Sequence, residues 1–207
     1  MLKKALSLPV FDYFLALFIV NIILMTIAGF FYNGTFHFWT YPFSYLGTAY
    51  TQEGHLNTVA SHIYSADMIA SALILFLLAN HLHKKNIKKN SLKPILCFVA
   101  GSGAIIAAFA PDDTMSTFHV IGSALLVSSL WALATDFLYD IRHNIGKSKY
   151  YTLQFAILQF PIFLYAAAFF LSLDPIDDIL QKPAFLGLTV ALLYSTYYLN
   201  TNEKTTS

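Results

Sequence analysis

The chain has 207 residues, of which 57% are hydrophobic and only 11% are charged, with a formal net charge of +1. A soluble domain usually carries about 25% charged residues. This deficit excludes a water-exposed globular surface, and a mean hydropathy of +0.59 agrees. No stripe of Lys and Arg lies on a soluble face, and we expect no nucleic-acid partner. The single cysteine excludes an intramolecular disulfide and a cysteine-rich metal site.

Apolar segments follow one another along almost the whole chain. A helix that crosses a bilayer needs about 20 apolar residues, and a helix satisfies its own backbone groups in lipid. The sequence therefore predicts an all-α, polytopic membrane protein that forms a single membrane domain over 1–207. We expect six transmembrane helices, at 12–32, 61–82, 94–110, 117–139, 151–172 and 183–200.

Basic residues predict how these helices are oriented. Eleven of the 12 Lys and Arg residues fall before the first helix, in the second and fourth connections, or after the last helix. With six spans all four regions share one side of the membrane, and only Lys182 lies opposite. Because basic residues mark the cytoplasmic side, we expect both termini inside a multi-pass cell-membrane protein.

The first outer connection, 33–60, is long and rich in aromatic residues. One interpretation is an aromatic belt at the membrane interface. The other is a lid that folds back over an outward-facing cavity, because irregular backbone at membrane depth must be buried in protein. In the third helix, small residues such as Gly103 and Ala107 predict close helix packing and a central place in the bundle.

Polar residues enter the second helix near its outer end. His62, Tyr64, Ser65 and Asp67 follow one another there, and ionisable residues inside a span are functional candidates by default. Asp67 lies roughly 140° around the helix from His62, on the stripe that carries Tyr64 and Ser71. The two could therefore line one cavity from neighbouring faces.

The sequence PDDTMSTFHVIGS supplies a second polar group, where the third helix ends and the fourth begins. Either Asp112 or Asp113 is a candidate helix cap. Ser116, His119 and Ser123 share one face of the fourth helix. His119 lies at the same depth as His62, so we expect the two imidazole rings to converge.

Three interpretations of these residues stay open. A divalent metal such as zinc would use His62 and His119 with Asp67, Asp112 or Asp113, and would leave a position for activated water. A structural seam would join the second and fourth helices, with Asp67 fixing a histidine tautomer. A ligand site would use the same groups to hold a lipid head group.

The function expected from these residues is the binding or processing of a lipid or small amphiphile from the outer leaflet. It would be a metal-assisted hydrolase or a non-enzymatic binding, sensor or transport protein. In the hydrolase, His62, Asp67 and His119 would be the catalytic and metal-binding residues. The expected ligand-binding residues are Ser44, Ser65, Asp112, Asp113 and Ser123.

The sequence YPFSYLGT at 41–48 and the string at 111–123 resemble the bacterial and archaeal domain-of-unknown-function family 998. That resemblance implies about six spans and an outward-facing site, without an established activity. The matching residues are Ser44, Leu46, Gly47, Pro111 and His119.

Ser61, His62 and Asp67 are also similar to part of the zinc site of membrane hydrolases related to alkaline ceramidases and adiponectin receptors. That resemblance implies a zinc-dependent hydrolase. The histidine pair that these hydrolases carry on their last helix has no counterpart in 183–200, and a seventh helix is missing.

Overall fold

The computed structural model describes residues 8–85, 92–144, 151–173 and 176–205. Within these ranges the chain forms six long helices, one short 3-10 segment and no β-strand, which confirms the all-α prediction. The elements are α2 (Val10–Phe30), η1 (Phe43–Gly47), α3 (Thr58–Lys85), α4 (Lys93–Phe109), α5 (Ser116–Asn144), α6 (Tyr151–Phe170) and α7 (Ile176–Thr205).

Four of these helices, α2, α3, α5 and α6, are long and apolar enough to cross a membrane. This indicates a membrane protein. Among the described elements, α4 is apolar but shorter, with 17 residues, and α7 carries polar residues at both ends. Pro94 lies in the first turn of α4, where a helix does not use the N–H that proline lacks. The helix ends before Pro111, because the residue that precedes a proline avoids helical geometry.

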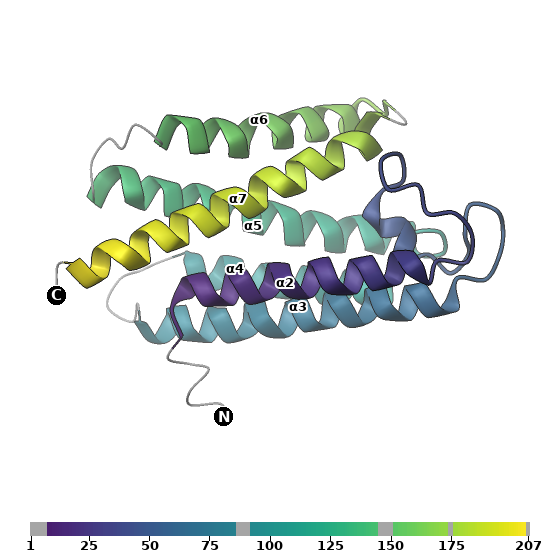
Figure 1. Cartoon of the computed structure of the whole chain (residues 1–207), viewed down its shortest axis with the longest axis horizontal. Helices are drawn as coiled ribbons and strands as arrows, with labels where there is room; N and C mark the ends of the chain where they lie inside the picture. Colours follow the sequence, from purple (N-terminus) through teal and green to yellow (C-terminus); the bar gives the residue numbers. More distant parts are fainter. Residues whose placement is uncertain (1–7, 86–91, 145–150, 174–175, 206–207) are drawn as a thin grey trace.

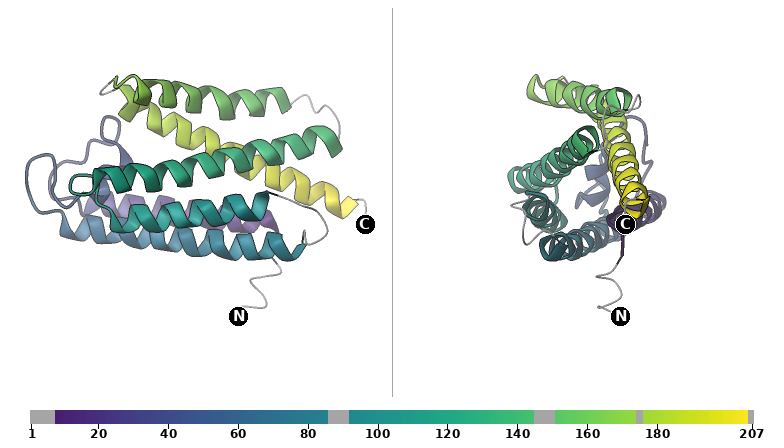
Figure 2. Two further views of the ribbon diagram at one scale, coloured as in Figure 1. Left: turned by 180° about the vertical axis from the view of Figure 1, so that it is seen from behind. Right: turned by 90° about the vertical axis from the view of Figure 1, so that its left-hand side faces the viewer.

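Successive helices run in alternating directions along one axis (Figure 1). Helices α2, α3, α4 and α5 each pack against the next, and α7 closes the ring by packing against both α5 and α2. Helix α6 lies outside this ring, mainly against α7 (Figure 2). Only 17% of the most apolar 18-residue stretch of α6 is buried, so most of its side chains face the surroundings of the bundle.

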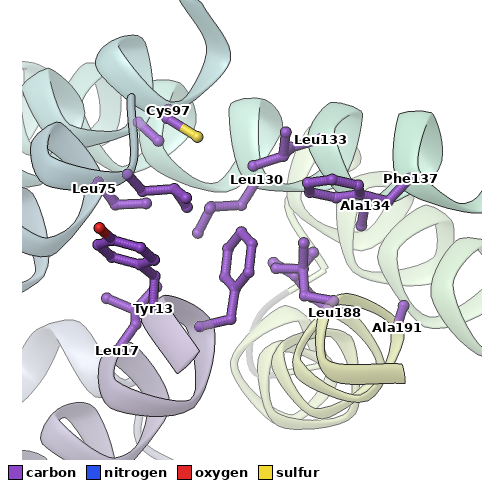
Figure 3. Close-up of a cluster of buried hydrophobic side chains, with 14 of the residues drawn as sticks. Tyr13, Leu17, Leu75, Cys97, Leu130, Leu133, Ala134, Phe137, Leu188 and Ala191 are labelled. Carbon is purple, nitrogen blue, oxygen red and sulfur yellow. The ribbon is translucent and has the colours of Figure 1, made fainter. Parts of the chain in front are cut away.

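The main hydrophobic core fills the ring away from η1. Phe14, Leu75, Leu133 and Leu188 are almost completely buried there. Figure 3 shows that the cluster draws on α2, α3, α4, α5 and α7, and that Cys97 from α4 is part of it. The buried cysteine therefore acts as a small apolar side chain.

The close packing predicted for the third helix is present between α4 and α5. A Cβ atom added to Gly103 would lie 2.5 Å from the carbonyl oxygen of Gly122, so the two backbones are in contact. The predicted central place is wrong, because the main helix contacts of α4 are with its sequence neighbours α3 and α5.

One end of the bundle, which we call the loop end, carries the connections 31–57 and 110–115 (Figure 1). There η1 folds back against α2 and α3. Leu46 is 1% exposed and belongs to a second apolar cluster with Tyr64 and Met68. The loop therefore folds back against the bundle, and the two interpretations of its aromatic residues stay predictions.

Candidate functional site

His119 lies in the first turn of α5 and is only 5% exposed. Its Nδ1 atom lies 2.8 Å from the carbonyl oxygen of Ala110, at the end of α4. A carbonyl oxygen can only accept, so Nδ1 carries the hydrogen and donates it. In the neutral ring Nε2 then holds a free lone pair, and no described residue donates a hydrogen bond to it.

Tyr64 of α3 lies next to this ring, with the two ring centroids 6.5 Å apart. Its side chain is 6% exposed, and no hydrogen bond to its hydroxyl occurs among the described residues. Neither this hydroxyl nor Nε2 of His119 is among the atoms sealed inside the bundle. The other side of the tyrosine ring packs against Gly47, where any Cβ atom would collide with the ring.

Asp112 connects this pair to the folded-back loop. One of its carboxylate oxygens accepts a hydrogen bond from the hydroxyl of Ser44 at 3.2 Å, and the other accepts one from Ser116 at 3.3 Å. Asp67 and Asp112 both lie within electrostatic range of Tyr64. Asp112 is half-buried and Ser116 is exposed, so the group opens to the outside at the start of α5. We call Ser44, Tyr64, Asp112, Ser116 and His119 the His119 cluster.

The neighbouring Asp113 holds the loop in place. Its two oxygens accept hydrogen bonds from the backbone N–H groups of Ala49 and Tyr50, at 3.0 and 2.9 Å. Farther along the loop, the hydroxyl of Tyr32 accepts a hydrogen bond from the backbone N–H of Gln52. Burial raises the pKa of Tyr32, and this backbone hydrogen bond acts against that rise.

Helix α7 holds the same loop from the opposite side. The side-chain oxygen of Gln181 accepts a hydrogen bond from the N–H of Phe43 at 2.8 Å. The ammonium of Lys182 donates to the carbonyl oxygen of Tyr41 and lies 5.6 Å from the centre of the Phe43 ring. Asn57 donates from its amide to the carbonyls of Leu46 and other residues of the loop. The loop is therefore held by Asp113, by α7 and by Asn57.

Asp67 is fully buried, and its hydrogen bond belongs to a different group of residues. Its Oδ1 atom accepts a hydrogen bond from Asn21 of α2 at 3.3 Å, and Asn21 also donates to Ser71 at 2.7 Å. Its Oδ2 atom is enclosed and has no partner. These hydrogen bonds join α2 to α3, whereas the predicted seam joined the second and fourth helices, which are α3 and α5. The carbonyl of Ala110, and not Asp67, fixes the tautomer of His119.

His62 points away from both groups. Its side chain is exposed, and its Nδ1 atom lies 2.6 Å from the carbonyl oxygen of Thr58 in its own helix. It lies roughly 200° around α3 from Tyr64, which contacts His119. Accordingly, the parts of the chain that the structure describes contain no group of three His, Cys, Asp or Glu residues that could hold a metal ion. The structure does not bring His62, Asp67 and His119 together.

The two remaining expected ligand-binding residues lie outside the cluster. The hydroxyl of Ser65 donates to the carbonyl oxygen of Ala108 at 2.7 Å, which links α3 to the end of α4. Ser123 is half-buried, one turn beyond His119. Sequence reasoning left Tyr64 out of the expected site, although it shares a helix stripe with Asp67.

Two open grooves are found elsewhere on the bundle. One, of about 360 Å³, lies between the end of α2 and the start of α3 and is lined by Phe30, Tyr32 and Asn57 among others. The other, of about 400 Å³, lies between α5 and α6 beside Trp131 and Gln159. Neither is lined by the His119 cluster.

Comparison with known proteins found no matching family model, no matching curated protein and no matching solved structure. The two family resemblances therefore stay predictions.

Proposed function

We propose that this chain is a six-span protein of the cell membrane that binds the head group of a lipid or small amphiphile at its loop end. The observation that carries the proposal is the buried imidazole of His119. Its Nδ1–H donates to the carbonyl oxygen of Ala110. Its Nε2 atom and the adjacent Tyr64 hydroxyl have no hydrogen-bond partner among the described residues. Neither atom is enclosed by the protein, so both are accessible to a ligand that approaches the neighbouring carboxylate.

Binding, without a committed reaction, fits these residues better than a metal-assisted hydrolase. A metal-binding histidine does commonly donate its other N–H to a carbonyl, as His119 does. However, a catalytic zinc ion takes three protein ligands, and no such group occurs among the described residues. The hydrolase would also need His62, which faces away from the cluster.

The membrane topology is part of the proposal. Six spans with both termini inside would put the loop end outside, because the basic residues gather at the other side. The cluster then lies at the level of the outer leaflet, where lipid head groups begin. Helices α4 and α7 would complete the four spans already indicated by length and composition.

Cysteine labelling tests this topology. In a Cys97→Ala background, Glu53→Cys lies in the aromatic loop and Lys85→Cys at the last residue of α3. An impermeant maleimide should label position 53 in intact cells and position 85 only after the membrane is opened. Labelling of position 85 from outside intact cells would contradict the topology.

Binding is tested most sharply by His119→Asn. The asparagine amide can still donate to the carbonyl of Ala110, but it removes the Nε2 lone pair. We expect lipid affinity to drop about two- to tenfold, since losing one hydrogen bond corresponds to roughly 0.5–1.5 kcal/mol. Native mass spectrometry of the purified protein with added lipids measures this affinity.

His62→Asn is the matched control. It makes the same histidine-to-asparagine change on the face of α3 opposite to Tyr64, outside the His119 cluster. It should leave lipid affinity unchanged. If His62→Asn weakens binding and His119→Asn does not, the His119 cluster is not the binding site. Unchanged circular dichroism and melting temperature in both variants establish that the fold is intact.

A further inference from the structure

The His119 cluster offers atoms that accept hydrogen bonds. Nε2 of His119 is an acceptor once Nδ1 has donated to Ala110. The carboxylate of Asp112 receives hydrogen bonds from two hydroxyls, and a carboxylate has about four acceptor positions. A ligand that matches this arrangement must therefore supply N–H or O–H donors.

The charge around the cluster is negative. Asp112 has no ion-pair partner within 4.0 Å among the described residues, and the neighbouring Asp113 adds a second carboxylate. Tyr165 of α6 lies within electrostatic range of Asp112, Asp177 and Asp178, which places two more acidic residues on the same side, and Lys182 offsets the charge of Asp178. A head group of net negative charge, such as that of phosphatidylglycerol, would be repelled here, because like charges disfavour each other most strongly where water is scarce.

The basic residue described at this end does not neutralise Asp112. The ammonium of Lys182 donates to the backbone carbonyls of Tyr41 and Asp178, and it lies over the ring of Phe43. Its side chain is 8% exposed, so these contacts hold it inside the protein. The half-buried carboxylate of Asp112 is therefore left to a cation from outside the chain.

We infer that the ligand of the His119 cluster carries a primary ammonium group, as in an aminophospholipid head group. The inference rests on the proposed function and names the chemistry of its ligand. An ammonium with three N–H donors matches the carboxylate of Asp112, Nε2 of His119 and the hydroxyl oxygen of Tyr64. A quaternary ammonium has the same charge but no N–H to donate, so it would bind more weakly.

The test compares lipids with identical acyl chains: phosphatidylethanolamine, phosphatidylcholine and phosphatidylglycerol, each titrated into the full-length protein and followed by native mass spectrometry. We expect phosphatidylethanolamine to bind at least about tenfold more tightly than the other two. Asp112→Asn should weaken the binding of phosphatidylethanolamine more than that of phosphatidylcholine, because ethanolamine loses a charge-assisted hydrogen bond whereas choline loses only the attraction between charges. Asp12→Asn, which alters a half-buried aspartate at the opposite end of the bundle, should change neither affinity.

The other outcomes separate the two proposals. Equal affinity for phosphatidylethanolamine and phosphatidylcholine, with both lost in His119→Asn, overturns the ammonium inference and keeps the proposed function. Tighter binding of phosphatidylglycerol also overturns the inference. If no lipid binding depends on His119, the proposed function fails. A competition experiment adds soluble glycerophosphoethanolamine to the protein with bound phosphatidylethanolamine. If the soluble compound displaces the lipid at equal concentration, the ligand is a soluble amine and the choice of a lipid is overturned.

Discussion

Gly103→Ala is expected to destabilise the protein by about 1–3 kcal/mol, as overpacking a filled interior does. The added Cβ atom would lie 2.5 Å from the Gly122 carbonyl oxygen and 2.6 Å from the Leu126 backbone nitrogen. Both atoms belong to the backbone of α5, so no side-chain rotation can relieve the contact. Helices α4 and α5 must separate, although alanine by itself favours a helix by about 1 kcal/mol over glycine.

Thermal unfolding in detergent, followed by circular dichroism, measures this loss. Gly29→Ala is the matched control, because the nearest atom to its added Cβ would be a Phe36 ring carbon at an ordinary 3.9 Å. We expect that control to melt at or above the wild-type temperature. Equal melting temperatures for Gly103→Ala and the wild type would contradict the contact between α4 and α5.

Asn21→Leu is expected to have a comparable effect for a different reason. It removes the donor that serves both Oδ1 of Asp67 and the hydroxyl of Ser71. The fully buried Asp67 side chain would then lack the hydrogen bonds that the structure describes, since its Oδ2 atom already has none. Leaving a buried polar group unsatisfied costs about 1–3 kcal/mol.

The double variant Asn21→Leu/Asp67→Leu separates this effect from lost packing. Replacing both partners by apolar residues of similar size removes the unsatisfied group, so the double variant should unfold at a higher temperature than Asn21→Leu alone. The expected coupling is about 0.5–3 kcal/mol. If the loss in the double variant equals the sum of the losses in Asn21→Leu and in Asp67→Leu, the hydrogen bond between α2 and α3 contributes nothing specific.

The helices were predictable because their signals are local. The predicted segment 151–172 corresponds to α6 (Tyr151–Phe170), and 94–110 corresponds to α4 (Lys93–Phe109). A proline in the first turn of α4 and another after its end mark both limits. The extra turns of α7 before residue 183 were not predicted, because Asp177 and Asp178 interrupt the apolar pattern there.

The site was predictable only in part, for a physical reason. His119 and Asp112 follow from the chemistry of a polar group where one helix ends and the next begins. The partners depend on how distant segments meet: Ser44 reaches Asp112 only because η1 folds back, and Tyr64 meets His119 only because α3 presents that stripe inward. The prediction that His62 faces His119 was wrong. The sequence indicated how deep His62 lies in the helix, but the direction of its side chain depends on which face of α3 packs against the other helices.

The most direct measurement locates a bound lipid on the chain. A phosphatidylethanolamine that carries a photoreactive group next to its amine is incorporated into membranes containing the protein, and the labelled peptides are identified by mass spectrometry. We predict labelling within 41–50 and 110–123, and its loss in His119→Asn but not in His62→Asn. Labelling that concentrates on the exposed face of α6, or that is unchanged in His119→Asn, would contradict a head-group site at the His119 cluster.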